Sequence, residues 1–188
     1  MKRALTHRQN NEEKKGDFKV LILILAAIAV AFLVSTFLVR MIDVVGRSMD
    51  PTLKDGEWVL IDRVSYQFTK PKRGDIVVFE NKEITNSLIV KRIIAVPGDA
   101  VELQNGCLFI NEKPYEDEFS VRYGDVSRDR FTVPEDCYFV LGDNRSESND
   151  CVSWEEPYIK LEDIQGKVVL KLFPKIERIY KRKISTWE

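Results

Sequence analysis

The sequence predicts a mostly β protein, with one N-terminal transmembrane helix followed by an antiparallel β domain. The helix is predicted by an apolar span of twenty residues from Val20 to Val39, whose only polar members are Ser35 and Thr36. At about 1.5 Å per residue, this span crosses roughly 30 Å of hydrocarbon as a helix. The β domain is predicted by short β-branched or aromatic runs that end at Gly, Pro, Asp or Asn.

The charges around the apolar span predict its orientation. Six basic and three acidic residues precede it, whereas only Arg40 follows it closely. The positive-inside rule therefore places the N-terminus in the cytoplasm and the rest of the chain outside the cell membrane. A removable signal peptide is the alternative, but the apolar stretch is longer than its h-region and no small-x-small pair follows. We expect a cytoplasmic tail over residues 1–17, a signal anchor in membrane lipid over 18–39 and an extracytoplasmic domain over 40–188.

The strands of the outer domain are predicted from their apolar cores. A hairpin is predicted over 100–110, because the central pair Asn105-Gly106 tolerates positive φ in a two-residue turn. It belongs to a small β insertion at about 100–135, in which residues 112–130 carry ten charges in nineteen positions and are expected to be exposed. The other predicted strands are Trp58–Ile61, Asp75–Phe79, Leu88–Val96, Cys137–Leu141 and Lys167–Phe173.

Composition excludes several classes of function. Beyond residue 19 the chain has 23 basic and 27 acidic residues, so no nucleic-acid partner is expected. Three cysteines, without a CxxC pair or a nearby histidine, do not predict a metal site, and no cofactor is expected. Cys107 and Cys137 are expected to be buried thiols, with a bridge between them as the alternative. The only histidine, His7, lies in the tail, which excludes a Ser-His-Asp triad in the outer domain.

A serine and a lysine stand out once histidine is excluded. Ser48 lies in the segment GRSMDPTL, which must turn because Pro51 fixes its own φ and biases Asp50 toward extended geometry. Taken alone, a serine in such a turn is usually structural. Lys91 interrupts an apolar strand, where alternation places it on one face with Ile89 and Ile93. It either lies at a sheet edge with its head in water, the commoner case, or is desolvated with a pKa lowered toward that of a general base.

A third segment, GDNRSESND at 142–150, reads alone as a polar loop. Together with GRSMDPTL at 46–53, RGDIVVF at 73–79 and VKRIIAVPGD at 90–99, in this order behind an apolar span, it resembles the bacterial type I signal peptidases, or leader peptidases. The short chain and single span are similar to the Gram-positive branch of that family.

The resemblance implies a membrane-anchored serine endopeptidase that removes signal peptides from exported preproteins, cleaving after small residues at P3 and P1. Ser48 matches the nucleophile, Lys91 the general base, and Ser148 the serine that orients the lysine amine. The backbone N–H of Ser48 would hold the oxyanion. Some members add a serine hydroxyl two residues upstream, but Gly46 occupies that position here.

The resemblance also assigns a binding pocket and a scaffold. Arg92, Asp143 and Arg145 match scaffold positions. One departure concerns Val152, which stands where the family carries an arginine. Asp150 is therefore expected either to find another cation, with Arg92 and Arg145 as candidates, or to be exposed to solvent. The apolar residues that match the pocket wall are Ile42, Val44, Met49, Leu53, Val59, Val78 and Val90, for which ordinary core packing is the alternative.

Three other classes of protein compete with this interpretation. A self-cleaving repressor shares the Ser-Lys dyad, but it would carry a DNA-binding helical domain and no anchor. A non-enzymatic membrane-anchored β module explains the anchor and the strands, but not Lys91 within an apolar strand. A sortase would need a histidine beside its cysteine.

Overall fold

The computed structural model describes residues 19–32, 38–81, 85–124, 126–173 and 176–179, and the chain divides into two compact units, 1–39 and 40–188. In the first unit, residues 19–32 are helical. No helix within the described ranges combines the length and the apolar character that a membrane crossing requires. The predicted anchor at 18–39 includes residues 18 and 33–37, and these lie outside the described residues, as does the predicted tail.

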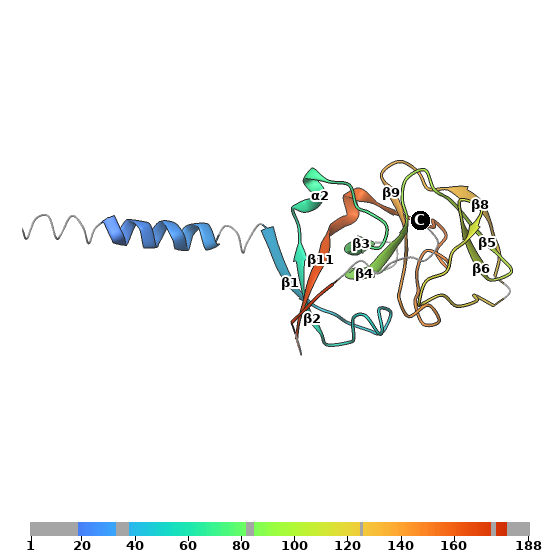
Figure 1. Ribbon diagram of the computed structural model, residues 1–188, viewed down its shortest axis with the longest axis horizontal. Coiled ribbons are helices and arrows are strands. Elements are labelled where there is room, and N and C mark those ends of the chain that lie inside the picture. Colours follow the sequence, from blue (N-terminus) through green and yellow to red (C-terminus); the bar gives the residue numbers. More distant parts are fainter. Residues whose placement is uncertain (1–18, 33–37, 82–84, 125, 174–175, 180–188) are drawn as a thin grey trace, which may run out of the picture. The chain divides into compact units, whose positions relative to one another are not determined.

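A large sheet forms the body of the second unit (Figure 1). Its order is β1-β2-β11-β3-β4-β9-β10, with β12 paired to β11, and every pairing from β2 to β10 is antiparallel. Short connections α2 (Ser65–Phe68) and η2 (Leu161–Asp163) join its strands. The strands are β1 (Val39–Asp43), β2 (Trp58–Asp62), β3 (Ile76–Asn81), β4 (Thr85–Ala95), β9 (Cys137–Leu141), β10 (Ile159–Lys160), β11 (Ile164–Phe173) and β12 (Glu177–Arg178).

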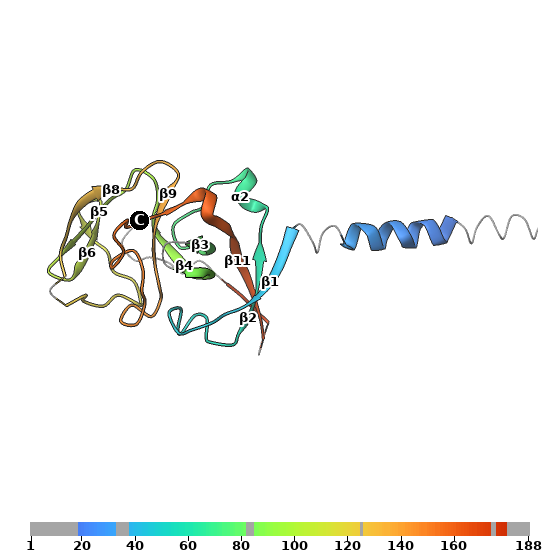
Figure 2. The same cartoon turned by 180° about the vertical axis from the view of Figure 1, so that it is seen from behind.

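A second sheet of four described strands, in the order β7-β6-β5-β8, lies beside β9, away from β1 and β2 (Figures 1 and 2). The strands are β5 (Ala100–Gln104), β6 (Cys107–Ile110), β7 (Lys113–Pro114) and β8 (Arg128–Thr132). The predicted hairpin is present as β5 and β6, and its turn residues Asn105 and Gly106 have φ of 48° and 77°. Both angles are left-handed, as a primed two-residue turn requires.

Two apolar clusters pack against the large sheet. One lies among β3, β4 and β9 and continues into the second sheet through Val101, Leu103 and Ile110. The other joins β1, β2 and β3 to the turn that contains Ser48, through buried Met49 and Leu53. Because β4 lies between β3 and β9, its backbone is paired on both sides and the strand is not at an edge of the sheet.

Three expectations about this unit need correction. The strands β4 and β11 begin at Thr85 and Ile164, earlier than predicted, because pairing such as Asn81 with Thr85 continues where the sequence is polar. Residues 112–130 are not uniformly exposed, since Tyr115 is buried. Cys107 is exposed rather than buried, because it points outward on a strand whose buried residues are Leu108 and Ile110.

Candidate active site

Lys91 lies in the interior of the large sheet. It is on β4, opposite Val77 of β3, and only 2% of its surface is exposed. The sheet-edge alternative is therefore wrong, because β4 has a neighbouring strand on each side. The same face of β4 carries Ile93 in the first apolar cluster, with Ile89 packed against it. An amine in such surroundings loses most of its hydration.

The surroundings of Lys91 favour its neutral form. Burial lowers the pKa of Lys91, while the negative charges of Asp150 and Asp143 and the thiol of Cys151 act in the opposite direction. Its Nζ donates a hydrogen bond of 2.9 Å to Oγ of Ser148. That bond fixes the direction of the amine. A neutral amine held in this way has a lone pair with which to accept a proton.

The Ser48 turn is fixed from both sides. At its start, the Gly46 N–H donates to Oδ1 of Asp55 at 2.7 Å. At its centre, Asn144 makes two hydrogen bonds of 3.0 Å, from its backbone N–H to the Ser48 carbonyl and from its side chain to the Arg47 carbonyl. Asn144 follows β9 in the loop that also contains Ser148. The loop of the third sequence block thus binds the backbone of the first.

Ser48 and Ser148 both pack closely against Gly142. A Cβ atom at residue 142 would collide with Oγ of Ser148 and with the carbonyl oxygen of Ser48. The backbone N–H of Gly142 donates to Oδ2 of Asp150 at 3.0 Å. Because Ser148 also accepts from Lys91, the structure brings all three residues predicted for the site into one neighbourhood.

Asp150 has neither of the environments expected from the sequence. Its exposure is 1%, so the exposed alternative is wrong. Arg92 and Arg145 pair with other carboxylates, so the arginine-partner alternative is wrong as well. Burial raises the pKa of Asp150, and hydrogen bonds from Gly142, Ser148 and Val152 oppose that rise. Backbone and hydroxyl donors thus take the place of an arginine partner.

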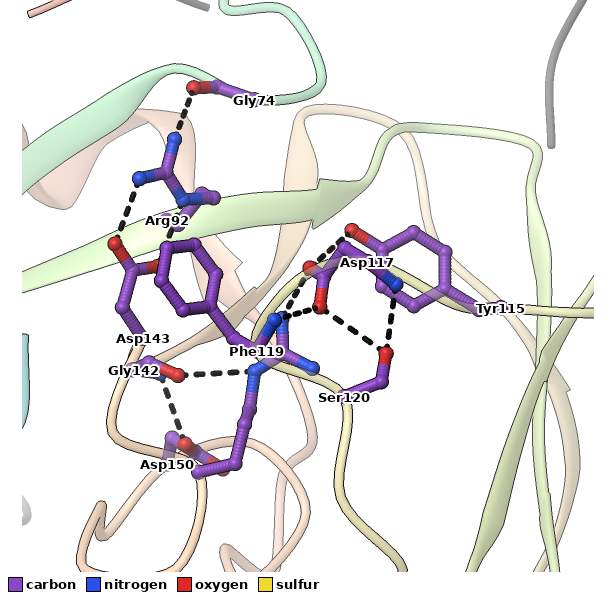
Figure 3. Close-up of polar contacts among 10 residues, drawn as sticks. Gly74, Arg92, Tyr115, Asp117, Phe119, Ser120, Gly142, Asp143 and Asp150 are labelled. Carbon is purple, nitrogen blue, oxygen red and sulfur yellow. Dashed lines mark hydrogen bonds and ion pairs between the residues drawn. The ribbon is translucent and has the colours of Figure 1, made fainter. Parts of the chain in front are cut away.

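Two buried arginines, Arg92 and Arg145, hold the loop that follows β9, and Figure 3 shows Arg92 with its partners Asp143 and Gly74. Arg92 donates from Nε and Nη2 to Asp143 at 2.7 and 2.6 Å, and from Nη1 to the Gly74 carbonyl at 3.1 Å. Arg145 donates from Nε to the Gly142 carbonyl at 3.0 Å and forms an ion pair with Asp117. Asp143 and Gly142 are adjacent, so the arginines hold the loop at consecutive residues.

The seven residues predicted for a pocket wall all belong to the second apolar cluster or pack on it. Six of them are buried, so core packing accounts for their position, while Val90 is partly buried opposite Val78. Val90 precedes Lys91 on β4. It is therefore the member of the set nearest in sequence to the candidate base.

Cys151, the cysteine nearest to the candidate site in the sequence, does not supply a second nucleophile. All three cysteines are free thiols, which excludes the bridge between Cys107 and Cys137 in this structure. Burial raises the pKa of Cys151, whose Sγ accepts a hydrogen bond of 3.3 Å from the Val140 N–H. A buried neutral thiol is unreactive. Within the described part of the chain, no cluster of three His, Cys, Asp or Glu residues could hold a metal ion.

Sequence reasoning assigned no role to Asn144 or Asp117. Asn144 was visible within the third block, but its partners lie 97 residues away in Arg47 and immediately beyond it in Ser48. Asp117 was one acid among ten charges in an insertion, and nothing local marked its partner Arg145.

A family model described as "Signal peptidase, peptidase S26" matches residues 18–173. The chain is 35% identical over 179 residues to signal peptidase IB of Staphylococcus aureus (strain COL), covering 86% of this chain and 92% of the relative. It is 38% identical over 161 residues to signal peptidase I P of Bacillus subtilis subsp. natto, covering 80% and 86%. A probable signal peptidase I-1 of Synechocystis is 31% identical over 159 residues, covering 81% and 80%.

The burial of Lys91 predicts a pH-dependent cost to stability. Its folded pKa is lowered, so between the folded and unfolded pKa values the unfolded chain binds the additional proton, and stability rises with pH. Lys91→Met removes this dependence. We expect the variant to melt at a higher temperature than the wild type at pH 7, with the difference shrinking as the pH approaches about 10.4. Thermal melting across pH measures it. The exposed control Lys72→Met should show no such trend; a constant difference for Lys91→Met would contradict the prediction.

Val152→Arg tests whether an arginine can reach Asp150. Val152 packs partly buried on the first cluster, and Arg128 already donates to the Val152 carbonyl at 3.4 Å and to the Trp154 carbonyl at 2.6 Å. A new guanidinium would lie close to that cation in an apolar position. We expect a loss of about 1–3 kcal/mol in the free energy of unfolding. Denaturant titration measures it, with uncharged Val152→Met as the near-neutral control. A more stable Val152→Arg protein would show that its side chain reaches Asp150.

Proposed function

Because this chain belongs to the signal peptidase family, peptidase S26, and is a serine protease, we propose that Ser48 and Lys91 are its catalytic dyad. Its activity is that of a signal peptidase, the removal of signal peptides from preproteins. The observation that carries the proposal is the buried Lys91 amine, which donates a hydrogen bond of 2.9 Å to Oγ of Ser148. Ser148 and Ser48 both pack against Gly142, so the amine and both serines lie in one region.

The proposed reaction begins with a neutral Lys91. Its Nζ takes the proton from Oγ of Ser48 as that oxygen attacks the carbonyl carbon of the scissile peptide. The lysine then gives the proton to the leaving amine, and the C–N bond breaks to leave an acyl-serine. Water attacks the ester with Lys91 again accepting the proton, and the Ser48 hydroxyl is restored. Ser148 is the positioning residue, since it binds one side of the amine and leaves the lone pair for Ser48.

The oxyanion is proposed to bind the backbone N–H of Ser48. Such a donor is typically worth about 2.7–4 kcal/mol when it is preorganised. The Asn144 hydrogen bonds to Arg47 and Ser48 support this role, because they fix the peptide group that contains that N–H and the next peptide group along the chain. Gly46 has φ of 91°, a conformation that disfavours any residue with a Cβ, which agrees with the absence of a serine hydroxyl at this position.

The proposed substrates are exported preproteins with small residues at P3 and P1. Support comes from the family and from Val90, which is only partly buried and directly precedes Lys91 on β4. An apolar side chain at this place suits an alanine-sized side chain of the substrate.

We also propose that the chain is anchored in the cell membrane by one span within residues 18–39, with its N-terminus in the cytoplasm and residues 40–188 outside. The apolar residues from Val20 to Val39 and the six basic residues before them support this arrangement. Anchoring would hold the site close to the bilayer, where the signal peptides of exported proteins also reside.

The dyad predicts strongly non-additive losses of activity. Ser48→Ala and Lys91→Ala should each abolish cleavage of a preprotein with alanine at P3 and P1, and the double variant should be no worse than either. Ser148→Ala should lower kcat, since the lysine loses its positioning bond. The measurement is product formation by the purified full chain in detergent.

Controls separate this chemistry from general damage. Ser146→Ala changes an exposed serine of the same loop and should cleave at the wild-type rate. A preprotein with leucine at P1 should not be cut. Substantial cleavage by Lys91→Ala would remove the dyad from consideration.

Anchoring predicts how the protein partitions in cells. The full chain should stay with membranes through alkaline carbonate extraction, and external protease should digest residues 40–188 in spheroplasts while sparing an N-terminal tag. Replacement of Leu23, Leu25 and Ile28 by lysine should release the protein from the membrane fraction, because charged side chains oppose insertion. Retention of that variant would contradict the proposed anchor.

A further inference from the structure

The inserted segment between β7 and β8 reaches the loop that carries Ser148. Asp117 binds Arg145 through an ion pair in which the side chains are 9% and 1% exposed. The same carboxylate accepts hydrogen bonds from the Tyr115 hydroxyl at 2.9 Å, the Phe119 N–H at 3.0 Å and the Ser120 hydroxyl at 3.1 Å. Figure 3 shows Asp117 surrounded by these donors. These hydrogen bonds from its own segment fix the position of the Asp117 carboxylate independently of Arg145.

Arg145 transmits that position to Gly142. Its Nε donates to the Gly142 carbonyl at 3.0 Å, and its guanidinium lies 6.0 Å from the centre of the Tyr115 ring. A buried guanidinium requires a counter-charge, and Asp117 supplies it. Without that carboxylate, the guanidinium of Arg145 would be buried and unpaired, and its free energy would be lower in a conformation that is exposed to water. The bond to Gly142 would then be lost.

Gly142 is closely packed against both serines of the site. A Cβ there would meet Ser148 and Ser48, so little space separates the Gly142 backbone from either residue. A displacement of the Gly142 peptide therefore moves Ser148 relative to Lys91.

The insertion contacts this region at two further points. The Phe119 ring lies 5.5 Å from the guanidinium of Arg92, which holds Asp143. Arg128, at the start of β8, donates to the carbonyls of Val152 and Trp154 beyond Asp150. The loop from 142 to 154 is thus held by the insertion at both ends.

We propose that Asp117 is a positioning residue for the reaction, which holds Arg145 on the Gly142 carbonyl and thereby fixes Ser148 against Lys91. The proposal rests on the proposed function of that pair. It assigns the insertion a part in the chemistry, although Asp117 itself does not touch the reacting atoms.

The test compares two buried carboxylates of the same kind. Asp117→Asn removes the charge that holds Arg145. Asp99→Asn is the matched control, because Asp99 also binds an arginine, Arg73 at 2.6 Å, together with the Val96 N–H and the Asn111 side chain at 2.8 Å. Asp99 lies immediately before β5, and these partners are all outside the Ser148 loop. Glu116→Gln, at an exposed neighbour of Asp117, controls for a change of net charge.

Two measurements are made on the full chain in detergent. The first is kcat and KM against pH with a preprotein that has alanine at P3 and P1. The second is direct titration of Lys91 by the NMR shift of its Cε, which does not depend on catalysis. The charged and titratable groups that face Lys91 are Asp150, Cys151 and Asp143, all on the loop after β9, while β3 presents apolar Val77. Both buried-carboxylate variants should lower the melting temperature.

For Asp117→Asn we expect kcat to fall by about tenfold to a hundredfold with little change in KM, the size of effect that a small misplacement produces. The acid limb of the profile and the Lys91 titration should both move to higher pH, because a loosened loop admits water to the amine. Asp117→Glu should restore part of kcat. Asp99→Asn and Glu116→Gln should leave kcat and the titration unchanged.

The proposal is overturned if Asp117→Asn loses stability like Asp99→Asn but keeps the wild-type kcat and Lys91 titration. If Asp117→Asn does not fold, Arg145→Lys replaces it, since this variant keeps the charge but loses the Nε bond to Gly142; an unchanged titration overturns the proposal there too. Cleavage by Ser48→Ala would instead refute the proposed function. In that case the Lys91 titration alone decides whether Asp117 positions the loop.

Discussion

An amine in the interior of a β-sheet has no water to solvate its charge, and Lys91 is in this situation between β3 and β9. Its partner on β3 is the apolar Val77, and the polar groups that act on the amine come from outside the sheet. The loop after β9 supplies these groups, with Ser148 bound to the amine and Asp150 beyond it. The position of that loop therefore determines the polar surroundings of the Lys91 amine, and Arg92 and Arg145 hold the loop in place.

The distribution of charge around Lys91 also affects its amine. A carboxylate near the amine would favour the ammonium form and remove its basic lone pair. Asp143, whose charge acts on Lys91, is neutralised by two hydrogen bonds from Arg92, and Asp117 is neutralised by Arg145. Asp150 has no such arginine, but burial raises its pKa and so weakens its tendency to carry charge. The charges of Asp143 and Asp117 are thus compensated by arginines and that of Asp150 is disfavoured by burial, and none of these three acids forms an ion pair with Lys91.

The features that the sequence predicted depend on residues close together in the chain, whereas the contacts that it missed connect residues far apart. The strands and the Asn105-Gly106 hairpin were predictable, because apolar alternation and turn residues act over a few positions. Ser48, Lys91 and Ser148 were singled out by a resemblance in spaced blocks, and their proximity required the structure. The partners of Asp150 were predicted wrongly, since backbone N–H groups carry no sequence signal. Asp117 and Asn144 were missed because their partners are 28 and 97 residues away, in segments with no local trace of the contact.

The feature with the widest reach is a side chain that is absent. Because Gly142 has no Cβ, the carbonyl oxygen of Ser48 and Oγ of Ser148 can both lie where the side chain of any other residue would begin. A search for reactive side chains would overlook Gly142, because glycine has no side-chain donor, acceptor or charge. Yet the smallest possible enlargement of the protein at this residue would act on both serines at once, whereas loss of either hydroxyl acts on one. The absence of a side chain at Gly142 is therefore as important to the proposed site as the hydroxyl and amine groups that it brings together.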